Sequence, residues 1–233
     1  MTEDEIDWVP LKISAIEYPK GDFIGKFLAL ISLSHIGIFA GFVTLITFRR
    51  DLHTITLFIG VLLNELICMT LKYIIAEPRP YIRNNDQLYS EYGMPSSHAT
   101  MMFYLSTYMF YFMFIRTNYV KVDFITHLWK ILITTMFFVW AIMMAISRVY
   151  LKYHSIEQVV CGAIVGIIFG TVWFVVTQFF LTPLYPAIVS WRISEFLLIR
   201  DTTLIPNILW FEYTSARLED RTRRYKCGSR KSQ

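Results

Sequence analysis

Cysteine and charge are both scarce in this chain of 233 residues, which has three cysteines and 17% charged residues. Three cysteines (Cys68, Cys161 and Cys227) cannot form a disulfide framework, so we expect free thiols. The sequence has no C-x-x-C pair and no His/Cys/carboxylate cluster typical of a metal site, and we expect neither a metal nor a cofactor. It also lacks the basic start and short apolar run of a cleavable signal peptide, so the first membrane span is expected to direct insertion.

Apolar residues, by contrast, are abundant: the chain is 55% hydrophobic and 17% aromatic, with a mean hydropathy of +0.45. This content is too high for an ordinary soluble domain. Crossing a bilayer takes about 20 apolar residues per helix, and five segments are long enough: 27–48, 54–75, 98–115, 129–146 and 159–181. No internal repeat or low-complexity tract separates them. They predict one all-α domain at residues 27–181, a polytopic membrane helix bundle with about five transmembrane helices.

Basic residues gather on one side of this five-span chain. They follow the first segment, connect the third to the fourth, and fill the tail after the fifth: Arg49, Arg50, Arg116, Lys121, Lys130, and seven Lys and Arg residues from Arg217 onward. The positive-inside rule makes that side cytoplasmic. We therefore expect an amphipathic and basic cytoplasmic C-terminal segment at residues 182–233. Residues 1–26 are then a luminal or interfacial N-terminal segment.

Two histidines and several basic residues interrupt the apolar sequence in three clusters, all at the second and fourth connections. The clusters are Lys72 with Arg79-Pro80, Pro95-Ser96-Ser97-His98, and Ser147-Arg148 with His154. Charges beside a bilayer are costly and persist when they are paired or used. Three cationic side chains can clamp one phosphoryl group, and two imidazoles can serve as nucleophile and acid. The pattern predicts a phosphoryl-transfer site on the side opposite the cytoplasm.

Each cluster also has an ordinary interpretation. Lys72 and Arg79 at a helix end can extend toward lipid headgroups, and Ser96 and Ser97 are common N-cap residues. A single histidine in a loop is usually a polar surface residue. The ordinary explanation would have to apply to all three clusters, always on the same face of the membrane. Such a coincidence is improbable, and this favours the functional interpretation.

In this order and spacing, the clusters resemble the three signature motifs of the type 2 phosphatidic acid phosphatase superfamily. The resemblance implies that His154 attacks phosphorus to give a phosphohistidine, without a metal, and that His98 protonates the leaving group. The residues that it implies for phosphate binding are Lys72, Arg79, Ser96, Ser97 and Arg148.

One position departs from the pattern of that family. Four residues after the nucleophilic histidine, the family usually has an aspartate that orients the imidazole; here the position is Gln158, preceded by Glu157. The Gln158 carbonyl can fix the tautomer of His154 but cannot stabilise an imidazolium as a carboxylate does. Either Glu157 substitutes, or the reaction needs a weaker nucleophile, as it would if the leaving group were itself a phosphate.

Two polar residues, Asn64 and Glu65, lie near the centre of the second segment, where an isolated carboxylate is unfavourable. Glu65 and Lys72 share one helix face, about 10 Å apart along the axis. Glu65 can be protonated or bonded across the bundle for structural reasons alone, or both residues can support the phosphate site from beneath. Both alternatives stay open at this point.

The resemblance is closer still to the dolichyldiphosphatase family. It includes the sequences around the three motifs and extends to residues 17–22 and 194–213, so it covers nearly the whole chain. It implies a multi-pass enzyme of the endoplasmic reticulum membrane with a luminal site. The implied substrate is the polyprenyl lipid dolichyl diphosphate, recycled for protein N-glycosylation, with no nucleic-acid partner. The alternatives are a broader lipid phosphate monoester phosphatase and a catalytically silent protein that binds polyprenyl phosphates.

Overall fold

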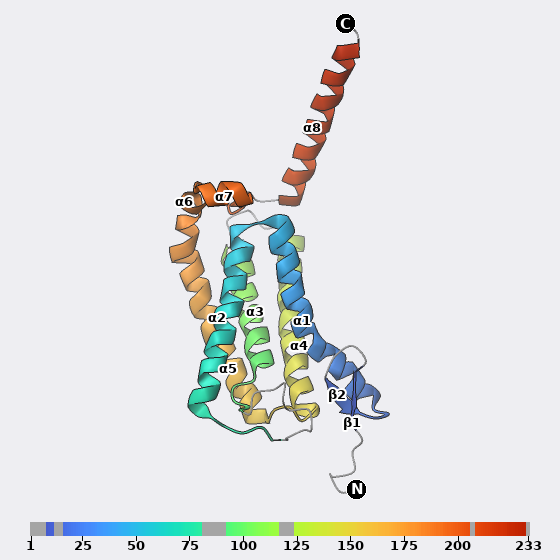
Figure 1. The fold of residues 1–233 in the computed structure, drawn as a ribbon, viewed down its shortest axis with the longest axis vertical. Helices are drawn as coiled ribbons and strands as arrows, with labels where there is room; N and C mark the ends of the chain where they lie inside the picture. The colour runs from blue at the N-terminus through green and yellow to red at the C-terminus, as the bar shows by residue number, and fades with distance from the viewer. Residues whose placement is uncertain (1–7, 12–15, 81–91, 117–123, 206–207, 232–233) are drawn as a thin grey trace.

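Five long helices lie side by side in one bundle in the computed structural model, which describes residues 8–11, 16–80, 92–116, 124–205 and 208–231 (Figure 1). They are α1 (Phe23–Arg49), α2 (Leu52–Ile75), α3 (Ser97–Phe114), α4 (Phe124–Tyr150) and α5 (Ile156–Val176). The predicted all-α bundle is confirmed. Parts of the predicted N-terminal segment (1–7 and 12–15) and Lys121 lie outside the described residues. Cys68 and Cys161 are free thiols, and the side chain of Cys227 is not among those described.

Four helices of the described chain are long and apolar enough to cross a membrane: α1, α2, α4, and the run Ile156–Val189 that begins with α5. The helix α3, which covers most of the predicted segment 98–115, is not among these four. It is the central helix of the bundle, packed between α4 and α5 with α2 beside it. Two of its polar side chains bond to neighbouring helices: Tyr104 donates to the Leu57 carbonyl at 3.0 Å and Ser106 to the Phe137 carbonyl at 2.9 Å. A central helix tolerates this polar content because its neighbours shield it.

Several helices start before the predicted apolar segments because polar N-caps begin them. Asp22 accepts a hydrogen bond from the Ile24 amide at 2.9 Å and so begins α1 at Phe23. Asp51 does the same for α2, accepting from the Thr54 amide at 3.2 Å. Such a cap satisfies an amide that the first helical turn leaves without a partner. Hydropathy marks only the apolar part of each helix.

Three glycines on one face of α5 allow its close contact with α3. A Cβ atom at Gly162 would lie 2.8 Å from the Ser96 carbonyl oxygen, and one at Gly170 would lie 3.0 Å from that of Tyr104. A Cβ atom at Gly166 would clash with the Thr100 carbonyl and lie 3.0 Å from the Tyr104 amide nitrogen. Small residues at every fourth position let membrane helices approach backbone to backbone. This contact places the start of α5 against the start of α3.

We expect Gly166→Ala to destabilise the bundle by about 1–3 kcal/mol, the usual cost of overpacking a tight contact. The atoms that the new Cβ would meet belong to the backbone of α3, so they cannot move aside as a flexible side chain would. Thermal unfolding in detergent measures the effect. Gly37→Ala is the matched control because nothing lies within 4 Å of a Cβ atom there; it should leave the melting temperature equal or higher. Equal stability of both variants would contradict the close contact.

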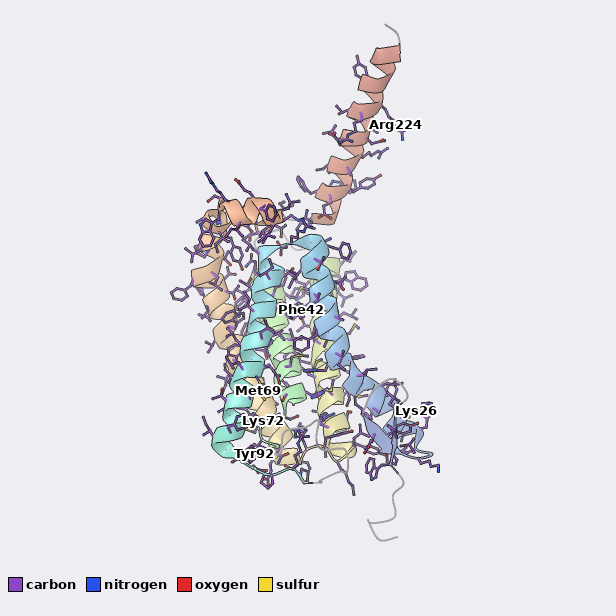
Figure 2. The ribbon with its side chains drawn as sticks, viewed as in Figure 1. Lys26, Phe42, Met69, Lys72, Tyr92 and Arg224 are labelled. Carbon is purple, nitrogen blue, oxygen red and sulfur yellow. The ribbon has the colours of Figure 1, made fainter. Side chains whose placement is uncertain are left out.

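The two ends of the bundle carry different structures. At one end, β1 (Trp8–Pro10) and β2 (Glu17–Pro19) form a small antiparallel hairpin. At the other, a π-helical turn (Thr177–Leu181), a 3-10 turn (Thr182–Leu184), α6 (Tyr185–Val189) and α7 (Arg192–Leu197) bend across the bundle, and α8 (Ile208–Lys231) leads away from it (Figure 1). Lys72 and Tyr92 lie at the hairpin end, opposite α7 and α8 (Figure 2).

The C-terminal segment is tied to the bundle by the turn between α1 and α2. The Leu52 amide donates to the Arg200 carbonyl at 3.1 Å, and the Arg200 amide donates to the Arg50 carbonyl at 3.0 Å. Thr202 donates to the Asp51 carboxylate. Beyond α6, large apolar side chains such as Phe196 and Leu204 are exposed, at 86% and 90%. The amphipathic character expected of residues 182–233 and their attachment to a cytoplasmic leaflet remain predictions.

Candidate active site

The bundle brings all three sequence clusters together at its hairpin end. Lys72 is in the last turn of α2, Ser97 and His98 begin α3, and Arg148 is in the last turn of α4. His154 lies in the short loop before α5. Each of these groups lies where one helix ends or the next begins, so packing the helices side by side with alternating direction is enough to gather them.

The first two clusters meet through a buried hydrogen bond. Lys72 Nζ donates to Ser97 Oγ at 2.8 Å, and both residues are buried. Beyond Lys72, α2 ends at Ala76, which has the left-handed backbone (φ 49°) of a helix C-cap. The chain then returns toward α3, where the Gly93 amide donates to the Glu77 carbonyl at 2.7 Å. The basic end of α2 is thereby held against the start of α3.

The Ser96 side chain does not cap its helix. Its backbone is at the N-cap position of α3, yet its side chain makes no capping hydrogen bond. Its Oγ is buried and has no hydrogen-bond partner in the described part of the chain. The Ser96 backbone amide donates to the backbone carbonyl of Gln158 at 3.1 Å, and this bond fixes the loop before α3 against α5. A buried hydroxyl at a helix N-terminus, beside N–H groups, is suited to an oxyanion.

The loop between α4 and α5 fixes Arg148 and His154 relative to each other. The Arg148 carbonyl accepts from the amides of Tyr153 at 3.0 Å and His154 at 3.2 Å. The Arg148 guanidinium lies over the Tyr153 ring, 4.1 Å from its centroid. Tyr153 OH in turn accepts from the Glu17 amide at 2.9 Å, which links the loop to β2. A cation–π contact of this kind orients the guanidinium plane.

Hydrogen bonds around Gln158 determine which nitrogen of His154 carries its proton. Gln158 Nε2 lies 2.9 Å from both Glu77 Oε1 and the Pro78 carbonyl, and both of these atoms accept hydrogen bonds. The other amide atom, Oε1, therefore accepts: it takes a bond from the Ser155 amide at 3.3 Å and lies 3.2 Å from His154 Nδ1. This network assigns the proton to Nδ1. The lone pair of the imidazole is then on His154 Nε2.

Burial and the neighbouring positive charges disfavour the protonated form of His154. Burial lowers the pKa of His154 well below the ordinary value of 6.5, and the positive charges of Arg148, Arg79 and Lys72 lower this pKa further. The hydrogen bond with Gln158 opposes the shift in part. Three cations converge on one neutral imidazole, an arrangement that attracts a phosphate and leaves a nucleophile unprotonated beside it.

His98 faces the same group of charges from the first turn of α3. It interacts electrostatically with Arg148, His154 and Lys72. Its ring stacks on that of His35, a residue of α1, with centroids 4.4 Å apart and planes at 29°. Sequence reasoning missed His35. The available signal was an imidazole inside an apolar segment, which is the same signal that marked Asn64 and Glu65.

The remaining candidates differ in where they lie. Gln158 is buried beside His154, whereas Glu157 is exposed on the first turn of α5. Glu65 interacts with Lys72 and Ser97 and so lies beside these two candidate side chains. Asn64 is fully buried, and neither of its amide atoms has a partner among the described residues. Cys68, which the sequence did not single out for this site, places Sγ 3.6 Å from Ser97 Oγ.

Known proteins resemble the chain along most of its length. The PAP2 superfamily matches residues 53–181, which include every candidate site residue. The chain is 44% identical to "Dolichyldiphosphatase 1" of Homo sapiens over 224 residues, 96% of this chain and 94% of that protein. It is 36% identical to "Dolichyldiphosphatase 1" of Dictyostelium discoideum over 88% of each chain. It is 33% identical to "Lipid phosphate phosphatase gamma" of Arabidopsis thaliana over 91% of this chain and 95% of that protein. No solved structure matches the chain significantly.

Proposed function

This chain belongs to the PAP2 superfamily, and we propose that it hydrolyses dolichyl diphosphate to dolichyl phosphate and inorganic phosphate. The reaction takes place at the luminal face of the endoplasmic reticulum membrane and recycles the lipid carrier of protein N-glycosylation. One observation carries the proposal: the buried His154 lies among three cationic side chains that can hold a phosphoryl group. Identity of 44% to a dolichyldiphosphatase over 96% of the chain supports the diphosphate as substrate.

The first step transfers the terminal phosphoryl group to His154. The Nε2 lone pair forms a bond to the terminal phosphorus, and the bond between that phosphorus and the bridging oxygen breaks. Lys72, Arg79 and Arg148 balance the negative charge of the phosphoryl oxygens, and the N–H groups at the start of α3 bind them. Dolichyl phosphate leaves with the bonding electrons, and His98, which takes up a proton when the anionic diphosphate binds among the cationic side chains, donates that proton to the departing oxygen.

The second step releases inorganic phosphate. Water attacks phosphorus, the phosphorus–nitrogen bond breaks, and the electron pair returns to Nε2 of His154. The proton lost by water passes to His98, which restores the acid used in the first step. One water is consumed per turnover. A phosphate leaving group departs more readily than an alkoxide, so the first step makes a smaller demand on both histidines.

The side of the membrane follows from charge. Arg49, Arg50 and Arg116 lie at the bundle end that carries α6 and α7, and the basic helix α8 leads away from that end. The positive-inside rule assigns this end to the cytoplasm. The phosphate site at the opposite end then faces the lumen, and the basic C-terminal segment is cytoplasmic.

A second candidate function is hydrolysis of lipid phosphate monoesters in general. The similarity to "Lipid phosphate phosphatase gamma" favours it. Gln158 argues against it, because an alkoxide leaving group needs a stronger nucleophile and acid, and an amide supports His154 less than a carboxylate does. The two functions share one site and differ in their preferred substrate.

We expect the purified protein in detergent to release phosphate from dolichyl diphosphate at least about 10-fold more efficiently, as kcat/KM, than from dolichyl phosphate or phosphatidate. Excess EDTA should leave the rate unchanged because the proposed steps use no metal. Equal turnover of the monoesters would support the second candidate. Binding of dolichyl diphosphate without any release of phosphate would contradict the enzyme and support a protein that only binds polyprenyl phosphates.

A further inference from the structure

Glu77 is connected to His154 through the side chain of Gln158. Its carboxylate Oε1 accepts from Gln158 Nε2 at 2.9 Å, and the opposite end of the same amide lies 3.2 Å from His154 Nδ1. Glu77 precedes the Pro78-Arg79-Pro80 segment and is partly buried. It is separated from Gln158 by 81 positions along the chain. The fold thus places a carboxylate one amide group away from the nucleophile.

Both residues are held in this arrangement by their backbones. The Glu77 carbonyl accepts from the Gly93 amide at 2.7 Å, and the Gln158 carbonyl accepts from the Ser96 amide at 3.1 Å. Gln158 also forms a capping box with Ser155 at the start of α5, so its own position is fixed locally. A Cβ atom at Gly93 would lie 2.7 Å from Gln158 Cδ, so the missing side chain of Gly93 leaves the space that Gln158 occupies. The contact is therefore built from three separate segments.

We propose that Glu77 is the positioning carboxylate for His154 and acts through the Gln158 amide. The inference rests on the proposed role of His154 as nucleophile. As Nε2 forms its bond to phosphorus, positive charge develops on the imidazole ring. The charge of Glu77 polarises the amide, so that Gln158 Oε1 becomes a stronger acceptor for the Nδ1 proton. Glu77 touches neither the substrate nor the reacting atoms.

This relay accounts for the glutamine where the family usually has aspartate. A carboxylate in direct contact with Nδ1 would add its full charge beside the imidazole. The Gln158 amide transmits part of that effect. Two acceptors, Glu77 and the Pro78 carbonyl, determine the orientation of the amide, so that its oxygen faces Nδ1 and keeps the proton there. Glu157, the neighbouring carboxylate, is exposed and takes no part.

The test is a double-mutant cycle between Glu77→Gln and Gln158→Asp. Glu77→Gln keeps an oxygen that can accept from Gln158 and removes only the charge. We expect kcat to fall by roughly 10-fold with KM within about twofold, because the lost effect belongs to the transition state. In the Gln158→Asp background a carboxylate faces His154 directly. There Glu77→Gln should change kcat less than about twofold, because the amide that transmitted its charge is gone.

Two further variants keep the result interpretable. Gln158→Ala breaks the relay without adding a charge, and it replaces Gln158→Asp in the cycle if that variant does not fold. In the Gln158→Ala background, Glu77→Gln should again have no further effect on kcat. Glu157→Gln removes a charge from the exposed neighbour and should leave kcat unchanged. Only variants whose melting temperature equals that of the wild type are compared. An equal loss from Glu77→Gln in every background, or no loss in the wild type, would overturn the relay.

The failure of this inference can be distinguished from failure of the proposed function. If a variant without the His154 nucleophile keeps full activity, the mechanism itself is wrong. If that variant is inactive while Glu77→Gln matches the wild type, only the role of Glu77 is wrong. The substrate question does not enter, since the cycle can be measured with any phosphate compound that the enzyme turns over.

Discussion

Replacing His154 by asparagine is expected to lower kcat for dolichyl diphosphate by about 10⁴-fold or more, which is typical of losing a covalent nucleophile. The asparagine amide nitrogen can take the place of Nδ1 and donate to Gln158 Oε1, which lies 3.2 Å from that atom in the wild type. No atom takes the place of Nε2. The variant therefore keeps the contacts that hold the loop and loses only the group that attacks phosphorus.

Rapid quenching with terminally labelled substrate measures this loss directly. The wild type should retain acid-labile phosphate on the protein during turnover, and His154→Asn should retain none. His127→Asn is the matched control, because His127 is exposed in the first turn of α4, at the opposite end of that helix from Arg148. Normal turnover by His154→Asn, at equal protein level and equal melting temperature, would remove the phosphohistidine mechanism.

The site was predictable from sequence to the extent that its residues lie at helix ends. Lys72 and Arg148 lie where an apolar segment ends, and His154 lies just before the next segment begins. Helices that alternate in direction bring these ends and beginnings to the same side of the bundle. The order and spacing of the three clusters then indicated which family of sites they resemble. Neither argument needs the packing between particular helices, which is why both could be made before the structure was known.

Contacts that depend on packing could not be predicted in the same way. The bond between Glu77 and Gln158 joins positions 81 residues apart, and its formation depends on the close approach of α5 to α3. His35 reaches His98 from α1 for the same reason. Sequence alone showed that Gln158 could fix the tautomer of His154, but nothing in it indicated which group would orient the amide.

The central position of α3 was also hidden in the sequence. Its apolar and aromatic residues predicted one more membrane span, with nothing to set it apart from the other four, whereas most of its first three turns are buried against neighbouring helices. The small residues Gly162, Gly166 and Gly170 on α5 were an available signal, because their spacing is typical of close helix contacts. That signal identifies one partner of the contact and leaves the other undetermined.

Replacing Arg148 by lysine is expected to reduce kcat/KM by about 100-fold, although the positive charge is kept. Arg148 is 2% exposed, and its guanidinium is oriented by the Tyr153 ring 4.1 Å away. A guanidinium can donate two parallel hydrogen bonds to a phosphoryl group, and an ammonium group cannot reproduce that geometry. Steady-state kinetics with the preferred substrate measure the effect.

The lysine variant separates geometry from charge because the loop itself should persist. The amides of Tyr153 and His154 bond to the Arg148 backbone carbonyl, which the substitution leaves in place. Arg116→Lys is the matched control: Arg116 donates to Gln178, Thr182 and Thr203 at the opposite end of the bundle. It should lower the melting temperature and leave kcat/KM unchanged. A loss of less than about threefold in Arg148→Lys would mean that charge alone holds the phosphoryl group, and that the stacked guanidinium serves the fold instead.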